Sequence, residues 1–369
     1  MINRDRLVNE FMDIVRIDSL TKKERTMADF LKGKLGELGL EVSEDQAGEA
    51  CGGEAGNVIG VLDGDEGKTA LMFLAHMDRV KPGEGVQPVL EGDVIKSDGK
   101  TVLGSDDGAG IAAILEMLRV IKENNVAHGR LEVVFTIAEE GGLFGAKGLD
   151  VEKLKARKGI VLDSTGEVGT VINRAPAQDE IVARVFGKAS HAGVSPEKGI
   201  NAIVVAAKAI SRMKIGRIDE ETTSNIGIIE GGKATNIVPD FVEVRGEARS
   251  RVEEKLVAAT EGICREFIRA AEEENTRVEL DVKRLYPAYY VQEDDELLKL
   301  VHRAGESAGL KIEVKPTGGG SDANIINGKG VTAVNLAVGN EEVHTVEEYI
   351  RASDMVKITE LALKIVELA

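Results

Sequence analysis

The chain has 369 residues, which exceeds the size of one typical hydrophobic core and therefore predicts two domains. Its net charge of -17 argues against nucleic acid or an anionic membrane as a partner, and no apolar run is long enough to span a bilayer. The two cysteines and an N-terminal segment without a signal-peptide core predict a cytoplasmic protein.

Strands and amphipathic helices alternate along the first half of the chain. Apolar residues at helical spacing predict helices at 3–17, 25–39 and 109–122. Short apolar runs predict strands at 57–62, 69–75, 131–138 and 158–162. This alternation indicates an α/β fold with a mostly parallel sheet covered on both faces.

The pattern changes near residue 178 to strand, helix, strand, strand, helix, strand. The predicted elements lie at 181–186, 200–213, 223–229, 241–248, 252–274 and 277–283. This order is the split βαβ arrangement of ferredoxin-like domains. The first pattern then resumes, with a helix at 294–308, strands at 311–315 and 331–337, and a mostly helical end at 346–368. We therefore expect one domain of residues 1–177 and 286–369, with an inserted lid and dimerisation domain at 178–285.

Histidines and carboxylates follow several of the apolar runs. They are His76, Asp106 with Asp107, Glu139 with Glu140, Asp163 and His344. Ligands in open α/β sheets bind beyond the carboxyl ends of the strands, so these side chains are expected to converge. Crowded carboxylates repel one another unless a cation is present. Two imidazoles with carboxylates and no thiolate favour zinc, with cobalt or manganese as alternatives.

Asp78 and the Glu139-Glu140 pair have further predicted roles. Asp78 lies two residues after His76 and can hold the imidazole in one tautomer. One of the paired glutamates can bind metal while the other acts as a general base. Each motif alone has an ordinary explanation, a surface ion pair or a solvated helix start. His128 and His302 are expected to be structural or solvated.

The motifs AHMD, GSDDGAG, AEEGG, LDS and VHT together resemble those of the co-catalytic dizinc peptidases. That family includes peptidase T (tripeptidase), carboxypeptidase G, aminoacylase and succinyl-diaminopimelate desuccinylase. The runs SDDGAGIAA, GGGSDAN and EVHTVEEYI are most similar to peptidase T. One departure is Gly108, where peptidase T commonly has lysine after the Asp pair.

The resemblance implies a role for each motif residue. His76 and Asp163 would hold one zinc ion, His344 and Glu140 the other, and Asp106 would bridge them. Asp78 would orient His76, and Glu139 would be the general base. Asp107 is not expected to be a ligand, and its peptide bond with Asp106 is expected to be cis.

The lid carries a second set of candidate residues. The resemblance implies that His191, Asn236 and Arg249 bind the substrate carboxylate and the developing oxyanion, partly across a homodimer. A turn histidine and an ordinary salt bridge are the alternatives for His191 and Arg249. Backbone N–H groups of the Gly318–Ser321 run, including Gly319 and Gly320, are expected to cradle substrate.

These observations predict a dizinc metallo-exopeptidase that hydrolyses short peptides, tripeptides first, through a zinc-bridging hydroxide with Glu139 as base. An N-acyl amino acid deacylase or glutamate carboxypeptidase with the same two zinc ions is the alternative. A non-catalytic binding protein on the same scaffold is a rival of another class, because fold alone does not fix function. Substrate side-chain preference, the metal used in the cell and the open or closed state are not readable from the sequence.

Overall fold

The computed structural model describes residues 1–369, which form two compact units. Unit 1 comprises Met1–Asn173, Tyr290–Pro316 and Ser321–Ala369. Unit 2 comprises Arg174–Tyr289 and Thr317–Gly320. No helix in either unit meets the length and hydropathy needed to cross a membrane.

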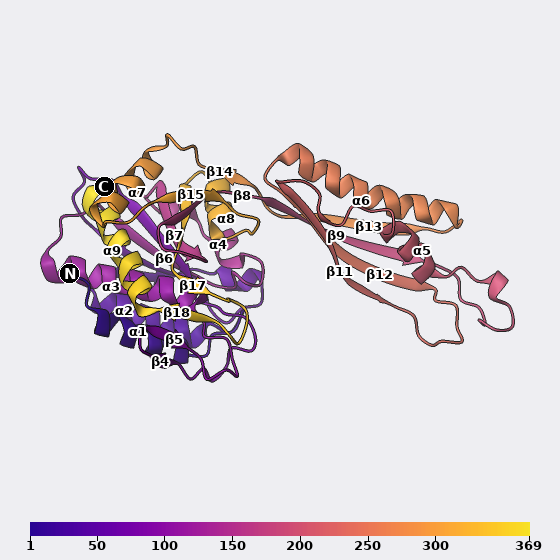
Figure 1. Cartoon of the computed structure of the whole chain (residues 1–369), viewed down its shortest axis with the longest axis horizontal. Helices are drawn as coiled ribbons and strands as arrows, with labels where there is room; N and C mark the ends of the chain where they lie inside the picture. Colours follow the sequence, from indigo (N-terminus) through magenta and orange to yellow (C-terminus); the bar gives the residue numbers. More distant parts are fainter. The chain divides into compact units, whose positions relative to one another are not determined.

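Unit 1 is built on a nine-stranded mixed sheet whose centre is parallel (Figure 1). The strands run in the order β1-β2-β6-β3-β7-β16-β8-β14, with β15 paired to β8. The parallel neighbours are β6, β3, β7 and β16. Their bounds are β1 Glu41–Glu44, β2 Val58–Leu62, β3 Leu71–His76, β6 Leu131–Thr136, β7 Lys158–Ser164, β8 Thr170–Ala175, β14 Tyr289–Tyr290, β15 Glu313–Pro316 and β16 Thr332–Ala337.

Helices cover this sheet because its central strands are apolar on both faces. Every residue of β3 and β6 is buried. Helices α1, α3, α7 and α9 pack on one another, and α8 packs on β7 and β16. The helices of unit 1 are α1 Arg4–Arg16, α2 Arg25–Glu37, α3 Ser105–Asn124, α4 Phe144–Gly148, α7 Glu296–Ser307, α8 Asp322–Gly328 and α9 Ala352–Leu368, with short 3₁₀ turns at Ala47–Ala50 and Val151–Lys153.

A small antiparallel sheet in unit 1 corrects one predicted element. It has the order β17-β18-β5-β4, with bounds β4 Val89–Glu91, β5 Val94–Lys96, β17 Asn340–Glu341 and β18 Tyr349–Arg351. The helix predicted from 346 therefore begins only at Ala352. The β18 residues pair with β5 instead, and Ile350 is fully buried there. Strand β8 was not predicted at all.

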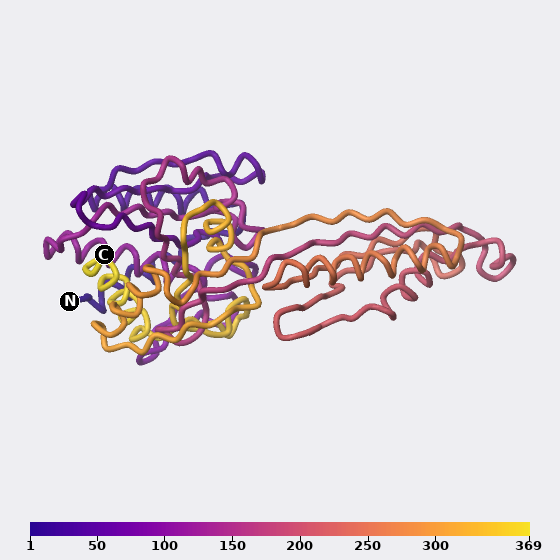
Figure 2. Tube along the Cα trace, turned by 90° about the horizontal axis from the view of Figure 1, so that it is seen from above, coloured from indigo at the N-terminus to yellow at the C-terminus, as the bar shows by residue number.

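Unit 2 has a five-stranded antiparallel sheet in the order β10-β11-β12-β9-β13. Its elements are β9 Ala177–Phe186, the 3₁₀ turn Pro196–Lys198, α5 Ala202–Ile210, β10 Gly216–Arg217, β11 Thr222–Gly231, β12 Phe241–Ser250, α6 Glu253–Glu273 and β13 Val278–Tyr286. Apart from the short β10, this is the predicted ferredoxin-like order. Figure 2 follows the chain through these elements. The core lies between α5, α6 and one face of the sheet, around Phe267, Ile181 and Val244.

Candidate metal centre

The predicted ligands meet in unit 1, although not all of them lie past strand ends. His76 is the last residue of β3, and Asp163 lies inside β7 rather than after it. Asp106 does not follow a strand. It lies in the first turn of α3, with non-helical φ and ψ of -90° and 100°. His344 lies in the turn between β17 and β18, with φ of 65°.

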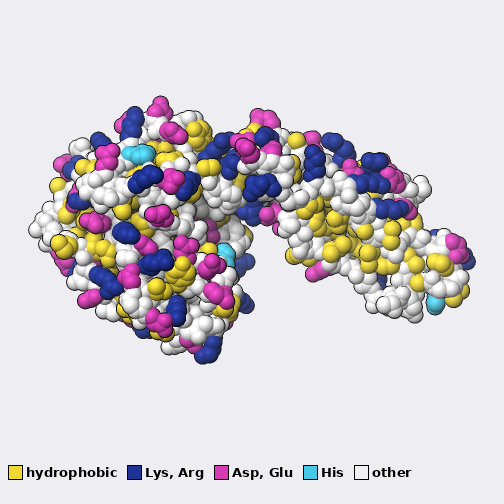
Figure 3. Space-filling model, in the orientation of Figure 1, with side chains coloured by type: hydrophobic (Ala, Val, Ile, Leu, Met, Phe, Trp, Pro, Cys, Tyr) yellow, Lys and Arg dark blue, Asp and Glu magenta, His cyan; other side chains and the backbone are white.

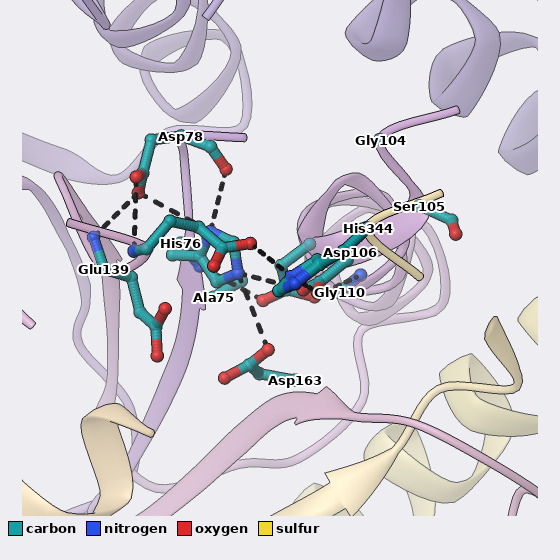
Figure 4. A network of polar contacts seen from close by, with 12 residues as sticks. Ala75, His76, Asp78, Gly104, Ser105, Asp106, Gly110, Glu139, Asp163 and His344 are labelled. Carbon is teal, nitrogen blue, oxygen red and sulfur yellow. Dashed lines mark hydrogen bonds and ion pairs between the residues drawn. The ribbon is translucent and has the colours of Figure 1, made fainter. Parts of the chain in front are cut away.

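Asp106 stands between the two imidazoles, one on each carboxylate oxygen (Figure 4). Its Oδ1 lies 3.0 Å from Nε2 of His76, and its Oδ2 lies 3.2 Å from Nε2 of His344. Each imidazole meets one further carboxylate. Asp163 Oδ1 lies 3.5 Å from His76 Nε2, and Glu140 Oε1 lies 2.8 Å from His344 Nε2. The two groups share only Asp106.

The tautomer of His76 is fixed by its neighbour's backbone. Nδ1 lies 2.9 Å from the carbonyl oxygen of Asp78, but 3.6 Å from Oδ1 of the Asp78 carboxylate. The ring therefore donates from Nδ1 to the carbonyl, which leaves Nε2 as the atom that faces Asp106 and Asp163. The orienting role of Asp78 stays a prediction, and in this structure its carbonyl oxygen lies closer to the ring than its carboxylate does.

The Asp78 carboxylate instead holds the backbone of the Glu139-Glu140 pair. Its Oδ1 accepts a hydrogen bond from Glu139 N at 2.8 Å, and its Oδ2 accepts from Glu140 N at 3.3 Å and from Thr21 Oγ1 at 2.8 Å. The carboxylate of Glu139 carries none of the contacts drawn in Figure 4, which end at its backbone nitrogen. The carboxylate of Glu140 instead contacts the ring of His344, so the two neighbouring glutamates have different surroundings.

The charges in this cluster oppose one another. Burial would lower the pKa of His76, but the nearby carboxylates, Asp106 first and then Asp163 and Asp78, hold it well above its usual range. Burial raises the pKa of Asp163 to about 7. Burial and the charge of Asp163 raise the pKa of Glu139 well above its usual range. These raised pKa values mean that protons offset the crowded negative charge, a role that divalent cations would take over when bound.

The donor set fits such ions. Ligand atoms of His76, Asp106 and Glu140 all lie within 4.8 Å of one another. His76, Asp107 and Asp163 form a second group under the same limit. Asp107 is engaged elsewhere, because its carboxylate accepts hydrogen bonds from His76 N at 3.1 Å and Gly110 N at 3.2 Å. Its peptide bond with Asp106 is cis, as the resemblance implied.

Sequence reasoning missed three buried carboxylates near the centre, Asp322, Glu24 and Glu348. Asp322 is 2% exposed, and its Oδ2 accepts a hydrogen bond from Thr136 Oγ1 at 2.5 Å while its Oδ1 has no partner. Burial raises the pKa of Asp322 to about 6. Glu24 is fully buried, and its Oε1 accepts from Ala138 N at 3.0 Å, one residue before Glu139. The only sequence signal for Asp322 was its place in the GGGSDAN run.

The candidate lid residues lie in unit 2. The loops of His191 and Asn236 are adjacent, since Ala192 N donates to Asn236 O at 2.9 Å. The His191 ring accepts from Gly193 N at 3.2 Å and is otherwise exposed. Arg249 forms the ordinary salt bridge that was the alternative, with Nε and Nη2 at 2.9 and 3.0 Å from the Glu247 carboxylate.

The two glycines of the candidate cradle are also in unit 2. Gly319 N donates to Thr317 Oγ1 at 3.2 Å. A Cβ at Gly320 would lie 2.3 Å from the Tyr286 ring, so this position has no room for a side chain. Nδ1 of His128 lies 2.7 Å from the carbonyl oxygen of Gly129, a structural contact.

The fold and this cluster define a two-unit α/β protein whose histidines and carboxylates form a centre suited to two divalent ions. The model of Peptidase family M20/M25/M40 matches residues 72–368, and the chain belongs to that family.

Three similar proteins carry related descriptions. The crystal structure of aminopeptidase PepT from Bacillus cereus ATCC 10987 has a TM-score of 0.92 and 45% identity, and the match covers 100% of this chain and 99% of that one. A tripeptidase from Staphylococcus aureus subsp. aureus Mu50 has a TM-score of 0.96 and 40% identity over 100% and 98%. Peptidase T of Geobacillus kaustophilus (strain HTA426) is 30% identical over 289 residues, 74% of this chain and 67% of the relative. The resemblance to peptidase T is confirmed.

Proposed function

We propose that the protein is a dizinc metallo-exopeptidase that hydrolyses short peptides, with tripeptides as the preferred class. The observation that carries this is the division of Asp106 between His76 and His344, each of which meets one further carboxylate. The similar aminopeptidase and tripeptidase support the substrate class. Cobalt or manganese is the alternative to zinc at the same ligands.

The chain's own residues divide the chemistry between them. Bound divalent ions supply polarisation of the scissile carbonyl and a lower pKa for the attacking water. Glu139, whose carboxylate is not engaged by neighbours, takes the proton of that water and returns it to the leaving amine.

Unit 2 is proposed to supply substrate contacts and a homodimer interface. Apolar side chains gather on the face of unit 2 that Figure 3 shows. Such patches mark interaction surfaces. Strand β13 lies at the edge of the sheet, where a second strand can pair. His191 and Asn236 would stabilise the oxyanion, and Arg249 would bind the substrate carboxylate.

The test is product analysis by mass spectrometry after zinc reconstitution. Equal concentrations of tripeptides, dipeptides and N-acyl amino acids are incubated with the protein and with the Glu139→Ala variant as control. We expect removal of one terminal residue from tripeptides, fastest of the three classes. Faster cleavage of N-acyl amino acids or of C-terminal glutamate would instead establish the deacylase or glutamate carboxypeptidase. No hydrolysis of any class by zinc-loaded protein would favour a binding protein. A cytoplasmic location remains a prediction.

A further inference from the structure

Glu348 is a buried carboxylate whose acceptor oxygens are filled by one short stretch of backbone. The residue is 1% exposed. Its Oε2 accepts hydrogen bonds from Leu103 N at 2.7 Å and Gly104 N at 2.9 Å. Its Oε1 accepts from Ser105 N at 2.7 Å, Ser105 Oγ at 2.6 Å and Asp106 N at 3.1 Å. These donors, rather than an ion-paired lysine or arginine, satisfy the carboxylate.

Such a cluster of hydrogen-bond donors favours an ionised carboxylate, because both carboxylate oxygens can then act as acceptors. Four of the five donors are consecutive backbone N–H groups, which form an anion-binding concavity. Hydrogen bonds to a charged acceptor are about twice as strong as neutral ones. Glu348 therefore fixes the path of the chain from Leu103 to Asp106.

Glu348 also lies close in sequence to His344, the second imidazole of the centre. We call Glu348 and its backbone donors from Leu103 to Asp106 the clamp. Glu348 lies four residues after His344, in the segment that leads into β18. The last donor of the clamp is the amide of Asp106, whose Oδ2 lies 3.2 Å from His344 Nε2. One carboxylate thus joins the two backbone segments whose side chains meet at the centre.

We propose that Glu348 is a positioning residue that holds Asp106 between His76 and His344 and thereby sets the affinity of both metal ions. This inference rests on the proposed two-ion site. Glu348 touches no ligand side chain directly. It acts through the backbone of Asp106, in the way that outer hydrogen-bond partners of metal ligands act generally.

A purely structural role is the competing explanation, and Glu132 provides the matched control. Glu132 is also fully buried, and its carboxylate accepts from Lys155 N, Ala156 N and Arg130 Nε at 2.8–2.9 Å. It lies near the start of β6, four residues before that strand's end and seven before Glu139. Replacing either glutamate by glutamine places an NH₂ group against backbone donors, so both variants test the same kind of loss.

The experiment compares Glu348→Gln and Glu132→Gln with the unchanged protein. Zinc affinity is measured by competition with a chromophoric chelator. The visible absorption spectrum of the cobalt-loaded protein reports ligand geometry, and thermal unfolding is recorded without metal. We expect both variants to unfold at lower temperature. Only Glu348→Gln should bind zinc about 10–100-fold more weakly and change the cobalt spectrum.

The outcomes separate this inference from the proposed function. Wild-type affinity and an unchanged cobalt spectrum in folded Glu348→Gln would overturn the positioning role alone. Absence of zinc binding by the unchanged protein would overturn the two-ion site and this inference with it. If Glu348→Gln does not fold, Ser105→Ala removes only one donor, and we expect zinc affinity to fall about two- to tenfold, the equivalent of one hydrogen bond. Unchanged affinity in Ser105→Ala would then count against the proposal.

Discussion

The Nε2 atom of His344 lies 3.2 Å from Oδ2 of Asp106, although 238 positions separate the two residues. The other oxygen of Asp106 is 3.0 Å from His76. A carboxylate shared in this way couples the two halves of the centre. Its loss should therefore affect both ions, while loss of Asp163 or Glu140 should affect one first.

Asp106→Asn should weaken both metal sites together. The amide keeps the size of the side chain but removes the negative charge and one acceptor oxygen. Zinc content after dialysis, measured by atomic absorption, should fall from two ions per chain, as a two-ion centre requires, to well below one. Asp179→Asn in unit 2, where Asp179 is bonded to Thr260 and Arg284, is the control and should keep its zinc. Loss of a single ion in Asp106→Asn would contradict the bridging role.

Glu139→Ala and Glu140→Ala should fail in different ways. Glu139 is proposed as the base and not as a metal ligand, so its loss should leave zinc bound but reduce kcat by about 10²–10⁴-fold. Glu140 lies 2.8 Å from His344 Nε2, so its loss should reduce zinc content. Zinc analysis and turnover on a tripeptide are measured on the same samples. Near-normal turnover of Glu139→Ala would require another base.

The ordered set of His76, Asp106, Glu140, Asp163 and His344 could be read from the sequence because each follows a recognisable apolar run. The assumption that every run was a strand was wrong for Asp106, because the TVLGS segment before it forms no strand and leads into α3. Asp106 still lies 3.0 Å from His76, because the first turn of α3 lies beside the end of β3.

The supporting carboxylates could not be predicted in this way. Glu24, Asp322 and Glu348 lie in polar or mixed segments, and their roles depend on backbone donors far away in the sequence. Glu348, for example, accepts from residues more than 240 positions earlier. No local period or spacing encodes such a contact. Likewise, β18 was taken as helix because its pairing with β5 is a long-range effect.

Glu24 should make the stability of the metal-free protein depend on pH. Burial, and secondarily the charge of Asp78, raise its pKa to about 7 from an ordinary 4.5. Between these values the folded state binds more protons than the unfolded state, so the free energy of unfolding falls as pH rises. Glu24→Gln should remove the part of this fall that Glu24 contributes, up to about 3 kcal/mol, and leave the parts from Asp163 and Asp322, whose pKa values are also raised. Urea unfolding at pH 5 and pH 7.5 in chelator checks it, and identical pH slopes for both proteins would contradict it.

Gly108, which stands where peptidase T commonly has lysine, packs closely against α1. A Cβ there would lie 3.3 Å from Val15, 3.4 Å from Ile14 and 3.5 Å from Phe11, all on α1. Gly108→Lys should therefore destabilise the protein by about 1–3 kcal/mol through overpacking. Urea unfolding measures the change, with Gly262→Lys, where a Cβ meets nothing within 4 Å, as a matched helical control. Equal stability of the two variants would show that α1 yields without cost.

The lid histidine should act on the partner's centre in a dimer. Arg249 pairs with Gln178 at one end of β9, whereas His191 follows the other end at Phe186. The eight steps of strand between Gln178 and Phe186 span about 26 Å at roughly 3.3 Å per residue. One lid therefore does not bring both residues to a ligand of tripeptide size, but two lids related by a two-fold axis can.

Complementation between two inactive variants tests this arrangement. His191→Ala and Glu139→Ala should each lose most turnover. After mixing, denaturation and refolding, heterodimers carry one centre with an intact Glu139 and an intact His191 from the partner, so partial activity should return. Native mass spectrometry with one tagged chain measures the heterodimer fraction, and refolded homodimers of each variant are the controls. If the mixture contains heterodimers and stays inactive, His191 does not act on the partner's centre. It then acts on the centre of its own chain or takes no part in the reaction.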